Sequence, residues 1–237
     1  MHHWTTHSGY TIYRVLSFRC NVFLITNGTK HLLIDCGSKR YRRQLVWSLA
    51  KLGIIHIDAL ILTHAHFDHA GNSHYIQNRF GASVIVHQDE ASFLCNGNSP
   101  LPKGTNWLTR FLIDHFGGLT ASLVRYQTCM ADLIVDETFS LDIYGFKGYI
   151  IHTPGHSCGS ISIIVDDEIV FAGDALFGVF PGSVFPPYAD DEAQLINSWH
   201  LLLNTGASLI MPSHGRPRSR KLLQKCIGNR NQKSIRS

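Results

Sequence analysis

The sequence predicts an α/β fold of the αββα sandwich type, in which two mixed β-sheets stack face to face and helices cover their outer faces. Two observations carry this prediction. Short apolar, strand-like runs occur in two blocks, and each block is accompanied by segments with helical periodicity. In addition, 237 residues with 44% hydrophobic and 16% charged side chains suit one domain with a core of its own. We therefore expect a single domain over residues 1–237.

The first block alternates strands with helices. An Asn27-Gly28 turn joins two alternating apolar stretches, as in a hairpin. A helical pattern follows, and Gly53 is a suitable stop for it. The expected strands cover residues 14–26, 30–35, 58–63 and 83–87, and the expected helices cover residues 40–52 and 72–80.

Residues 88–130 are the least regular part of the sequence. They combine Asn, Gly and Pro turns with one helical stretch at residues 107–116, and they are too short for a core. We interpret them as an insertion or lid over a site. The second block follows, with strands expected at residues 133–135, 139–143, 146–152, 160–165, 169–172 and 208–211, and helices expected at residues 190–203 and 219–227.

Charge is distributed unevenly along the chain. Residues 216–237 hold eight Lys or Arg and no acid, which leaves 21 − 8 = 13 basic against 17 acidic residues elsewhere. A basic C-terminal helix and tail could bind nucleic acid, but no aromatic residue interleaves with its charges, so we expect a solvated helix and disfavour nucleic acid as a partner. A small-molecule substrate is the expected partner, and the sequence carries no signal for an oligomeric state.

The sequence also bears on location. No apolar run approaches the roughly 18 residues that span a bilayer, which predicts no membrane segment. The start, from Met1 to Trp4, has neither the basic nor the apolar region of a secretory signal. The six cysteines form no CxxC pair, and we expect reduced thiols. These features predict a cytoplasmic protein.

The segment THAHFDHAG, residues 63–71, concentrates potential metal ligands. His64, His66, Asp68 and His69 fall within six residues directly after an apolar strand. On an extended segment His64 and His66 point the same way, and a turn can bring the next two ligands back toward them. Packing these groups together without a cation would cost several kcal/mol in desolvation. The pattern therefore predicts a metal site.

Three later segments each place a ligand type just after an expected strand. His156 lies in the Pro/Gly turn of TPGHSCGS, Asp174 ends the apolar run VFAGD, and His214 lies in PSHG. Loops at strand ends gather at one edge of a sandwich, where functional groups are commonly found. We expect these residues to join the first segment in one site.

Taken together, the motifs HxHxDHxG, TPGHSxGS, FxGDxLF and PxHG resemble the metallo-β-lactamase superfamily, over about residues 13–215. The resemblance implies the metallo-β-lactamase fold and a two-metal site. It also implies that Asp35, in the segment LIDCG, orients a metal-binding histidine. The ligand pattern of the family assigns one metal to His64, His66 and His156, the other to Asp68, His69 and His214, and a bridging role to Asp174.

Such a site predicts hydrolysis. Two divalent ions that share a water lower its pKa from 15.7 to about 7, and the resulting bridging hydroxide can attack an acyl or phosphoryl centre. Asp68 and Asp174 are the expected catalytic carboxylates. Nitrogen and oxygen ligands without a thiolate favour zinc, with iron or manganese as alternatives.

The substrate is less clearly indicated. The stretch GDALF resembles glyoxalase II, but residues 178–183, GVFPGS, depart from the Gly-Cys-Gly-Arg run of those enzymes. Phe177 stands where related lactonases carry a tyrosine. We expect cleavage of a small ester, thioester or lactone. The alternatives are β-lactam hydrolysis, an iron-dependent persulfide dioxygenase and a nuclease.

Residues beside the motifs are candidates for substrate contact. Five of them adjoin a ligand loop, namely His152, Cys158, Phe177, Phe180 and Tyr188. Three arginines just after His214 could hold a substrate carboxylate or phosphate, namely Arg216, Arg218 and Arg220.

Overall fold

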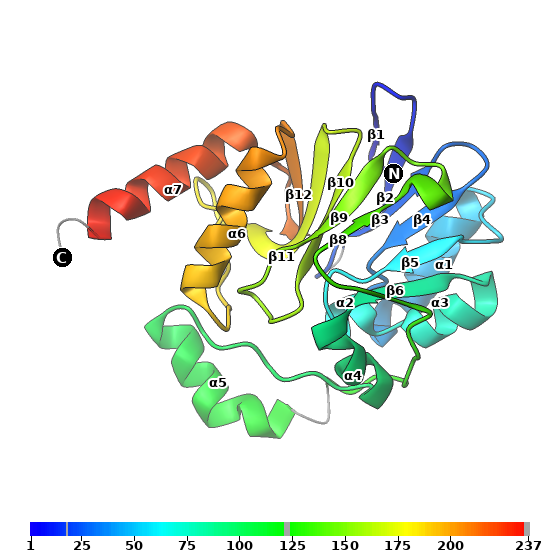
Figure 1. Cartoon of the computed structure of the whole chain (residues 1–237). Helices are drawn as coiled ribbons and strands as arrows, with labels where there is room; N and C mark the ends of the chain where they lie inside the picture. The colour runs from blue at the N-terminus through cyan, green and yellow to red at the C-terminus, as the bar shows by residue number, and fades with distance from the viewer. Residues whose placement is uncertain (18, 121–123, 235–237) are drawn as a thin grey trace.

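A computed structural model describes residues 1–17, 19–120 and 124–234 of the chain. Two β-sheets lie face to face, as expected (Figure 1). The first sheet keeps the strands in chain order, antiparallel from β1 to β4 and parallel from β4 to β7. Its strands are β1 (His3–Thr5), β2 (Thr11–Leu16), β3 (Val22–Thr26), β4 (His31–Ile34), β5 (Ala59–Ile61), β6 (Ser83–His87) and β7 (Leu133–Val135).

The second sheet has the order β13-β12-β11-β10-β9-β8. The β11 and β12 strands pair in parallel, and the other neighbours are antiparallel, so both sheets are mixed. Its strands are β8 (Thr138–Ser140), β9 (Gly148–His152), β10 (Ile161–Val165), β11 (Ile169–Gly178), β12 (Leu209–Gly215) and β13 (Arg218–Ser219).

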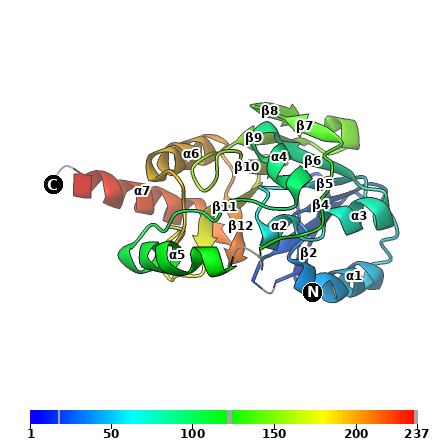
Figure 2. The same ribbon diagram turned by 90° about the horizontal axis from the view of Figure 1, so that it is seen from below.

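Helices cover both outer faces of the sandwich. The α1, α3 and α4 helices pack on the first sheet, and α6 and α7 on the second. The α5 helix runs along the edge at which α2 lies, and the far end of α7 projects from the body (Figures 1 and 2). The bounds are η1 (Lys39–Tyr41), α1 (Arg42–Lys51), α2 (Phe67–Ala70), α3 (Ser73–Phe80), α4 (Gln88–Asn96), α5 (Trp107–Thr120), η2 (Asp142–Tyr144), α6 (Glu192–Asn204) and α7 (Arg220–Ser234).

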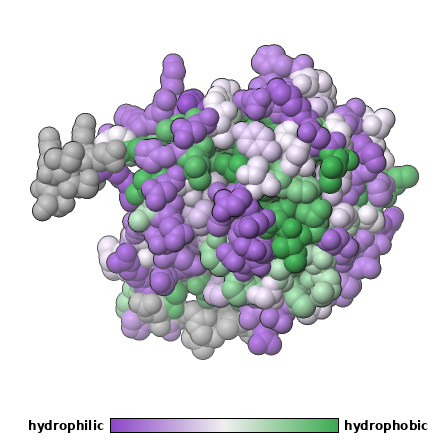
Figure 3. Space-filling model, viewed as in Figure 1, coloured by the Kyte–Doolittle hydropathy of each residue, from purple (hydrophilic) through white to green (hydrophobic). Residues whose placement is uncertain are grey.

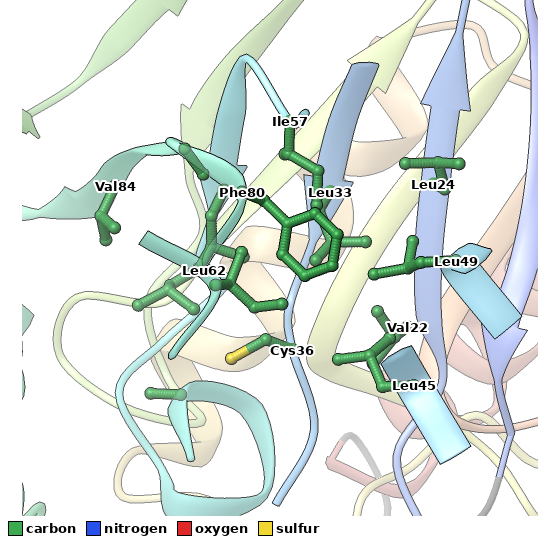
Figure 4. Close-up of a cluster of buried hydrophobic side chains, with 14 of the residues drawn as sticks. Val22, Leu24, Leu33, Cys36, Leu45, Leu49, Ile57, Leu62, Phe80 and Val84 are labelled. Atoms are coloured by element: carbon green, nitrogen blue, oxygen red, sulfur yellow. The ribbon is translucent and has the colours of Figure 1, made fainter. Parts of the chain in front are cut away.

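Strands that are apolar on both faces explain the layered core. In β3, Val22 and Leu24 point to the helices, whereas Phe23 and Ile25 point to the second sheet. The layer between the first sheet and its helices is shown in Figure 4. A third layer places the fully buried indole of Trp199 between α6 and the second sheet, where its Nε1 donates to the Ala175 carbonyl over 2.7 Å.

Several elements differ from the sequence expectations. The β1, α4 and β13 elements were not expected, and α5 and α7 extend beyond their expected ends. The single strand expected at residues 14–26 is two antiparallel strands, β2 and β3, and residue 18 lies outside the described residues. The strand expected at residues 139–143 gives way to η2, which ends at Gly145 with φ of +77°. The β11 strand runs six residues beyond the expected Ala172, because a bulge at Gly173 lets pairing with β12 resume.

The surface is largely hydrophilic on the face shown in Figure 3, with a hydrophobic patch near its middle. On α5, Trp107 is 79% exposed and Phe111 48% exposed, so their side chains lie outside the sandwich core. Within the described residues, no helix is long and apolar enough to cross a membrane.

Neighbouring leucines on α6 test the layered core. Leu202 is 1% exposed and Leu201 is 46% exposed. We expect Leu202→Ala to lower the free energy of unfolding by about 2–5 kcal/mol, because it leaves a cavity against the second sheet. Leu201→Ala serves as the matched control and should change it by less than about 1 kcal/mol. Urea unfolding measures both, and equal losses would contradict this packing.

Candidate metal centre

The first sheet supplies four of the candidate ligands through one loop and a short helix. The chain leaves β5 and passes through His64 and His66 in extended conformation before α2 begins. Asp68 and His69 then lie in the single turn of α2. Gly71 closes this turn so tightly that a Cβ there would lie 2.3 Å from the Phe67 carbonyl oxygen. The sequence HxHxDHxG is thus a turn that folds two pairs of ligands toward one point.

The second sheet supplies the other three. His156 lies in the turn after β9, and His214 lies near the end of β12. Asp174 lies inside β11 directly after the bulge at Gly173, which has φ of +53°. That left-handed conformation suits glycine and re-aims the strand, so the Asp174 carboxylate faces the ligands of the first sheet. All seven predicted ligands therefore come together at one edge of the sandwich.

One group consists of three buried histidines. One nitrogen from each of His64, His66 and His156 lies within 4.8 Å of the others. The closest pair is His66 Nδ1 and His156 Nε2, which are 3.1 Å apart. Nitrogens bound to one tetrahedral zinc ion at 2.0–2.1 Å lie roughly 3.3 Å apart. The spacing of this group therefore fits one ion.

The second group consists of Asp68, His69 and His214, whose ligand atoms also lie within 4.8 Å. His214 Nε2 lies 3.5 Å from Asp68 Oδ2, and His69 Nε2 lies 3.9 Å from Asp68 Oδ1. Asp174 stands between the two groups. Its Oδ2 is 3.7 Å from His156 Nε2 and 3.2 Å from His214 Nε2, and its Oδ1 is 3.6 Å from His69 Nε2. The Asp174 carboxylate therefore lies close to both ligand groups.

Hydrogen bonds behind the ligands determine which nitrogens are free. His156 Nδ1 donates to the Tyr188 carbonyl over 3.0 Å, which leaves Nε2 bare. Thr63 donates its hydroxyl to Asp35, so its oxygen accepts from His64 Nδ1 over 3.1 Å and leaves His64 Nε2 bare. Outer partners of this kind orient the imidazole ligands of metal sites. The bare nitrogens point into the cluster.

Several polar atoms in the cluster have no protein partner. Among the described residues, the fully buried unpaired side-chain atoms include His64 Nε2, His69 Nε2 and Asp174 Oδ1. Leaving such atoms unpaired costs about 1–3 kcal/mol each. The three lie at the meeting point of the ligand groups, and bound cations would satisfy them. The residues present thus fit a metal centre on their own chemistry.

The pKa shifts differ between the two ligand groups. In the second group, burial is outweighed by nearby acidic groups, which raise the pKa of His69 and of His214. The three-histidine group shows the opposite shift. Burial lowers the pKa of His66 and of His156 to about 4, and that of His64 well below its usual value. These imidazoles are therefore neutral near pH 7, which is the form that binds metals. Burial opposes ionisation of Asp174, but the adjacent His214 and His69 outweigh it and hold the Asp174 pKa well below its usual value.

Asp35 performs the orienting role expected from the sequence. Its carboxylate is fully buried and accepts from His69 Nδ1 over 2.8 Å, which leaves His69 Nε2 for the cluster. The same carboxylate accepts from the Thr63 backbone amide over 2.8 Å and from the Ser213 hydroxyl over 3.0 Å. Asp35 therefore ties ligand loops of both sheets together.

Two supporting residues were not anticipated from the sequence. Glu90, on α4, is 1% exposed and accepts from the amides of Ala65 and Gly159, over 2.9 and 3.3 Å. The Asn21 side chain donates to the carbonyls of Pro212 and Gly215, over 3.0 and 2.9 Å. Both side chains hold a loop that carries ligands. The only sequence signal for Glu90 was its place just after a strand, within a segment interpreted as a lid.

The insertion at residues 88–130 reaches the centre through its backbone. The Pro100 backbone lies next to the His66 imidazole and opposes the lowering of its pKa by burial. Gly104 pairs with Tyr188, whose carbonyl holds His156, and the Thr105 amide donates to the Pro187 carbonyl over 3.0 Å. The insertion therefore supports two ligands of the three-histidine group. Residues 121–123 of this segment lie outside the described residues.

The candidate substrate contacts divide between two places. Phe177 stacks on the His214 ring with centroids 4.7 Å apart, and Tyr188 acts through its carbonyl. His152 instead stacks on His87 at 4.0 Å and 18°, away from the ligands. Nearly parallel rings cannot both direct an in-plane nitrogen at one ion, so this pair is not a second metal site. Phe180 is 50% exposed. Cys158 lies at the surface, and partial burial of its thiol raises the pKa of that thiol.

Two of the three arginines after His214 bind backbone. Arg218 Nη2 donates to the Phe180 carbonyl over 3.0 Å, and Arg220 donates to the Leu203 carbonyl. They fasten β13 and the start of α7 to neighbouring segments. The expected role of this trio in holding a substrate anion is therefore open to Arg216 alone.

A cavity of about 260 Å³ adjoins the second ligand group and is lined in part by Asp68 and His214. The family model of the metallo-beta-lactamase superfamily matches residues 17–214, which include all seven ligands. The chain belongs to the metallo-beta-lactamase superfamily. The match confirms the resemblance seen in the sequence motifs.

Individual members of the superfamily are similar to this chain in sequence or in structure. A probable metallo-hydrolase of Methanocaldococcus jannaschii is 33% identical over 78% of this chain and 80% of its own length. The hydroxyacylglutathione hydrolase GloC of Haemophilus influenzae is 28% identical over 85% of this chain and 88% of its own. The crystal structure of the BLEG-1 B3 metallo-beta-lactamase covers 91% of this chain and 96% of its own, with a TM-score of 0.67 at 21% identity. This superfamily member is a metal-dependent hydrolase with the superfamily fold.

Removing the charge of Asp35 tests its orienting role. Asp35→Asn should weaken metal binding by roughly 10–100-fold, because His69 loses its carboxylate partner. Asp58→Asn is the control, since Asp58 pairs with Lys30 at 2.8 Å and is not part of the ligand cluster. Titration against a competing chelator measures affinity, with circular dichroism to verify folding. Unchanged affinity in folded Asp35→Asn would contradict the assignment.

Proposed function

We propose that the protein binds two divalent metal ions and hydrolyses a small thioester, ester or lactone. The observation that carries the two-metal assignment is the position of Asp174. Its carboxylate lies within 3.7 Å of His156 on one side and within 3.6 Å of both His69 and His214 on the other. A single ion would leave one of these groups, with its bare nitrogens, unsatisfied.

One ion would be held by His64, His66 and His156. The other would be held by Asp68, His69 and His214, and Asp174 would bind both ions. When bound, two such ions lower the pKa of a shared water to about 7 and polarise the oxygen under attack. Zinc suits these ligands, with iron or manganese as alternatives. Cys20 supplies no thiolate, because burial raises its pKa to about 12.

The protein groups divide the remaining work. Asp174 is 5% exposed and holds both ligand groups in register. The Asp68 side chain is 21% exposed and lines the cavity, so it faces both the ligand group and the space open to a substrate. An ionised carboxylate in this position can bind a metal through one oxygen and accept a proton on the other. We assign the catalytic roles to these two carboxylates.

The thioester is the favoured substrate class. The GDALF stretch around Asp174 is of the glyoxalase II type, and a relative with coverage above four fifths is named a hydroxyacylglutathione hydrolase. The Phe67 ring lines the cavity together with Asp68 and His214 and provides an apolar surface for an acyl group. The proposal includes a cytoplasmic location and a small-molecule partner rather than nucleic acid.

The decisive experiment combines metal analysis with turnover. Asp174→Ala should remain folded and lose at least one metal equivalent. Its activity should fall by more than the roughly 100-fold expected when a hydrogen-bond partner of a ligand is removed. Asp142→Ala, on exposed η2, is the control and should keep both metals and full activity. The substrates are a panel of thioesters, lactones, β-lactams and phosphodiesters. An Asp174→Ala protein with two metals and full turnover would refute the bridging role.

The same measurements separate the alternatives. One iron per chain together with oxygen uptake in the presence of a persulfide would indicate a dioxygenase. Turnover of only β-lactams or only phosphodiesters would point to those branches of the superfamily and reject the thioester proposal.

Exposed tryptophans allow the lid to be tested separately. Trp107 on α5 is 79% exposed and Trp47 on α1 is 57% exposed. If α5 closes over an acyl group, Trp107→Ala should change KM or acyl-chain preference several-fold, because each buried methylene contributes about 0.8 kcal/mol. Trp47→Ala should leave both unchanged, and neither variant should alter metal content. Identical kinetics for the two variants would remove α5 from substrate binding.

A further inference from the structure

We propose that the cavity beside Asp68 and His214 binds an anionic group of the substrate, a carboxylate or a phosphate, and that Arg19 is its anchor. This inference rests on the proposed hydrolase function, because it places the anion on the same molecule that is cleaved. It narrows the substrate class from thioesters in general to thioesters that carry a negative charge.

The cavity connects the metal centre to this arginine. Its volume is about 260 Å³, and Arg19 lines it together with Asp68 and His214. The hydroxyl-bearing residues Ser38 and Tyr41 line it as well. A substrate whose scissile bond lies at the ligand cluster therefore has room to extend past Asp68 toward a guanidinium and hydroxyl groups. These are the groups that bind carboxylate and phosphate oxygens.

The Arg19 guanidinium has no protein partner among the described residues. It makes no ion pair or hydrogen bond with any residue that the structure describes. Asp68, an acid lining the same cavity, is directed at His214 and His69 instead. Arg19 also has φ of +64°, a left-handed conformation that is unfavourable for a residue with a side chain. Such strain is commonly found where a side chain serves a ligand.

Two residues that line the cavity, Ser38 and Tyr41, adjoin a run of basic residues in the sequence. Ser38 precedes η1 and Tyr41 ends it, and the basic residues at the start of η1 and α1 are Lys39, Arg40, Arg42 and Arg43. Neither helix has an acidic residue in its first turn. Cations near a helix N-terminus are destabilising, whereas an anion bound there is stabilising. A bound substrate anion would offset this arrangement.

The alternative anchor lies on the C-terminal segment and is less available. Arg218 and Arg220 use their guanidinium groups on the carbonyls of Phe180 and Leu203. Neither belongs to the residues that line the cavity. Arg216 does not line the cavity either. Among the residues that line it, the guanidinium is therefore that of Arg19, which belongs to the β2–β3 connection.

The experiment uses matched substrates that differ by one anionic group. The phosphate pair is the acetyl thioesters of phosphopantetheine and of pantetheine. The carboxylate pair is the acetyl thioesters of N-acetylcysteine and of its amide. We expect metal-loaded wild-type protein to favour the charged member of one pair by roughly tenfold in kcat/KM. Whichever pair shows the preference identifies the anion.

The variants are Arg19→Gln, Arg19→Lys and the control Arg79→Gln. Arg79 is an arginine of α3 that lies against the Phe80 ring rather than at the cavity. Arg19→Gln should lose most of the preference, Arg19→Lys should keep the larger part, and Arg79→Gln should match wild type. The long-range part of the preference should decrease between about 0.01 M and 1 M salt, over which the Debye length falls from about 30 to 3 Å.

The outcomes separate this inference from the proposed function. If the neutral thioesters are hydrolysed without any preference for the charged members, or if Arg19→Gln keeps the preference, the anion site is wrong and the hydrolase stands. If no member is hydrolysed and the esters and lactones of the panel are not hydrolysed either, the proposed function fails. Calorimetry with the unreactive S-ethyl thioethers of the same pairs then decides the anion site, and equal affinities in wild type and Arg19→Gln would overturn it.

Discussion

The buried carboxylate of Asp174, surrounded by imidazoles with bare nitrogens, is the constraint on which the rest of the structure depends. Unpaired polar atoms of this kind are expensive inside a protein, and Asp174 Oδ1, His64 Nε2 and His69 Nε2 have no protein partner in the described chain. Cations satisfy all three at once. The protein thus keeps a group of atoms that is unfavourable without metal, and it must hold them against mutual repulsion.

Hydrogen bonds that cross between the sheets provide that rigidity. Asp35 joins Thr63 of the first sheet to Ser213 of the second, and the Ile161 amide donates to the Thr63 carbonyl over 2.9 Å. Because the ligands come from both sheets, any sliding of one sheet on the other would separate them. The apolar layer between the sheets resists sliding only weakly, since hydrophobic contact has no direction. The buried polar bonds therefore determine the register.

The sequence predicted the ligands more completely than their supports. The ligand motifs are short and local, and the spacing of His64 and His66 on an extended segment is enough to predict them as ligands. Glu90 bonds to residues that are 25 and 69 positions away in the sequence, and Asn21 bonds to residues more than 190 positions away. No local sequence pattern reveals such long-range contacts. The fold class followed from two blocks of apolar strands. The break between β2 and β3 was missed because the residues around Leu16 and Val22 are apolar on both sides of the turn.

The insertion shows why backbone and side-chain contributions to this site need to be distinguished. The Tyr188 carbonyl holds His156, and Gly104 and Thr105 of the insertion pair with the Tyr188 segment through their backbones. The path of residues 98–106 therefore matters to the metal centre, and it leaves no room for a side chain at Gly104, where a Cβ would lie 2.2 Å from the Arg110 amide nitrogen. Trp107, which begins α5 directly afterwards, is exposed and contributes no such bond. In the proposed lid, α5 would therefore be the part that adapts to different acyl groups, because the contacts with the Tyr188 segment come from residues before it.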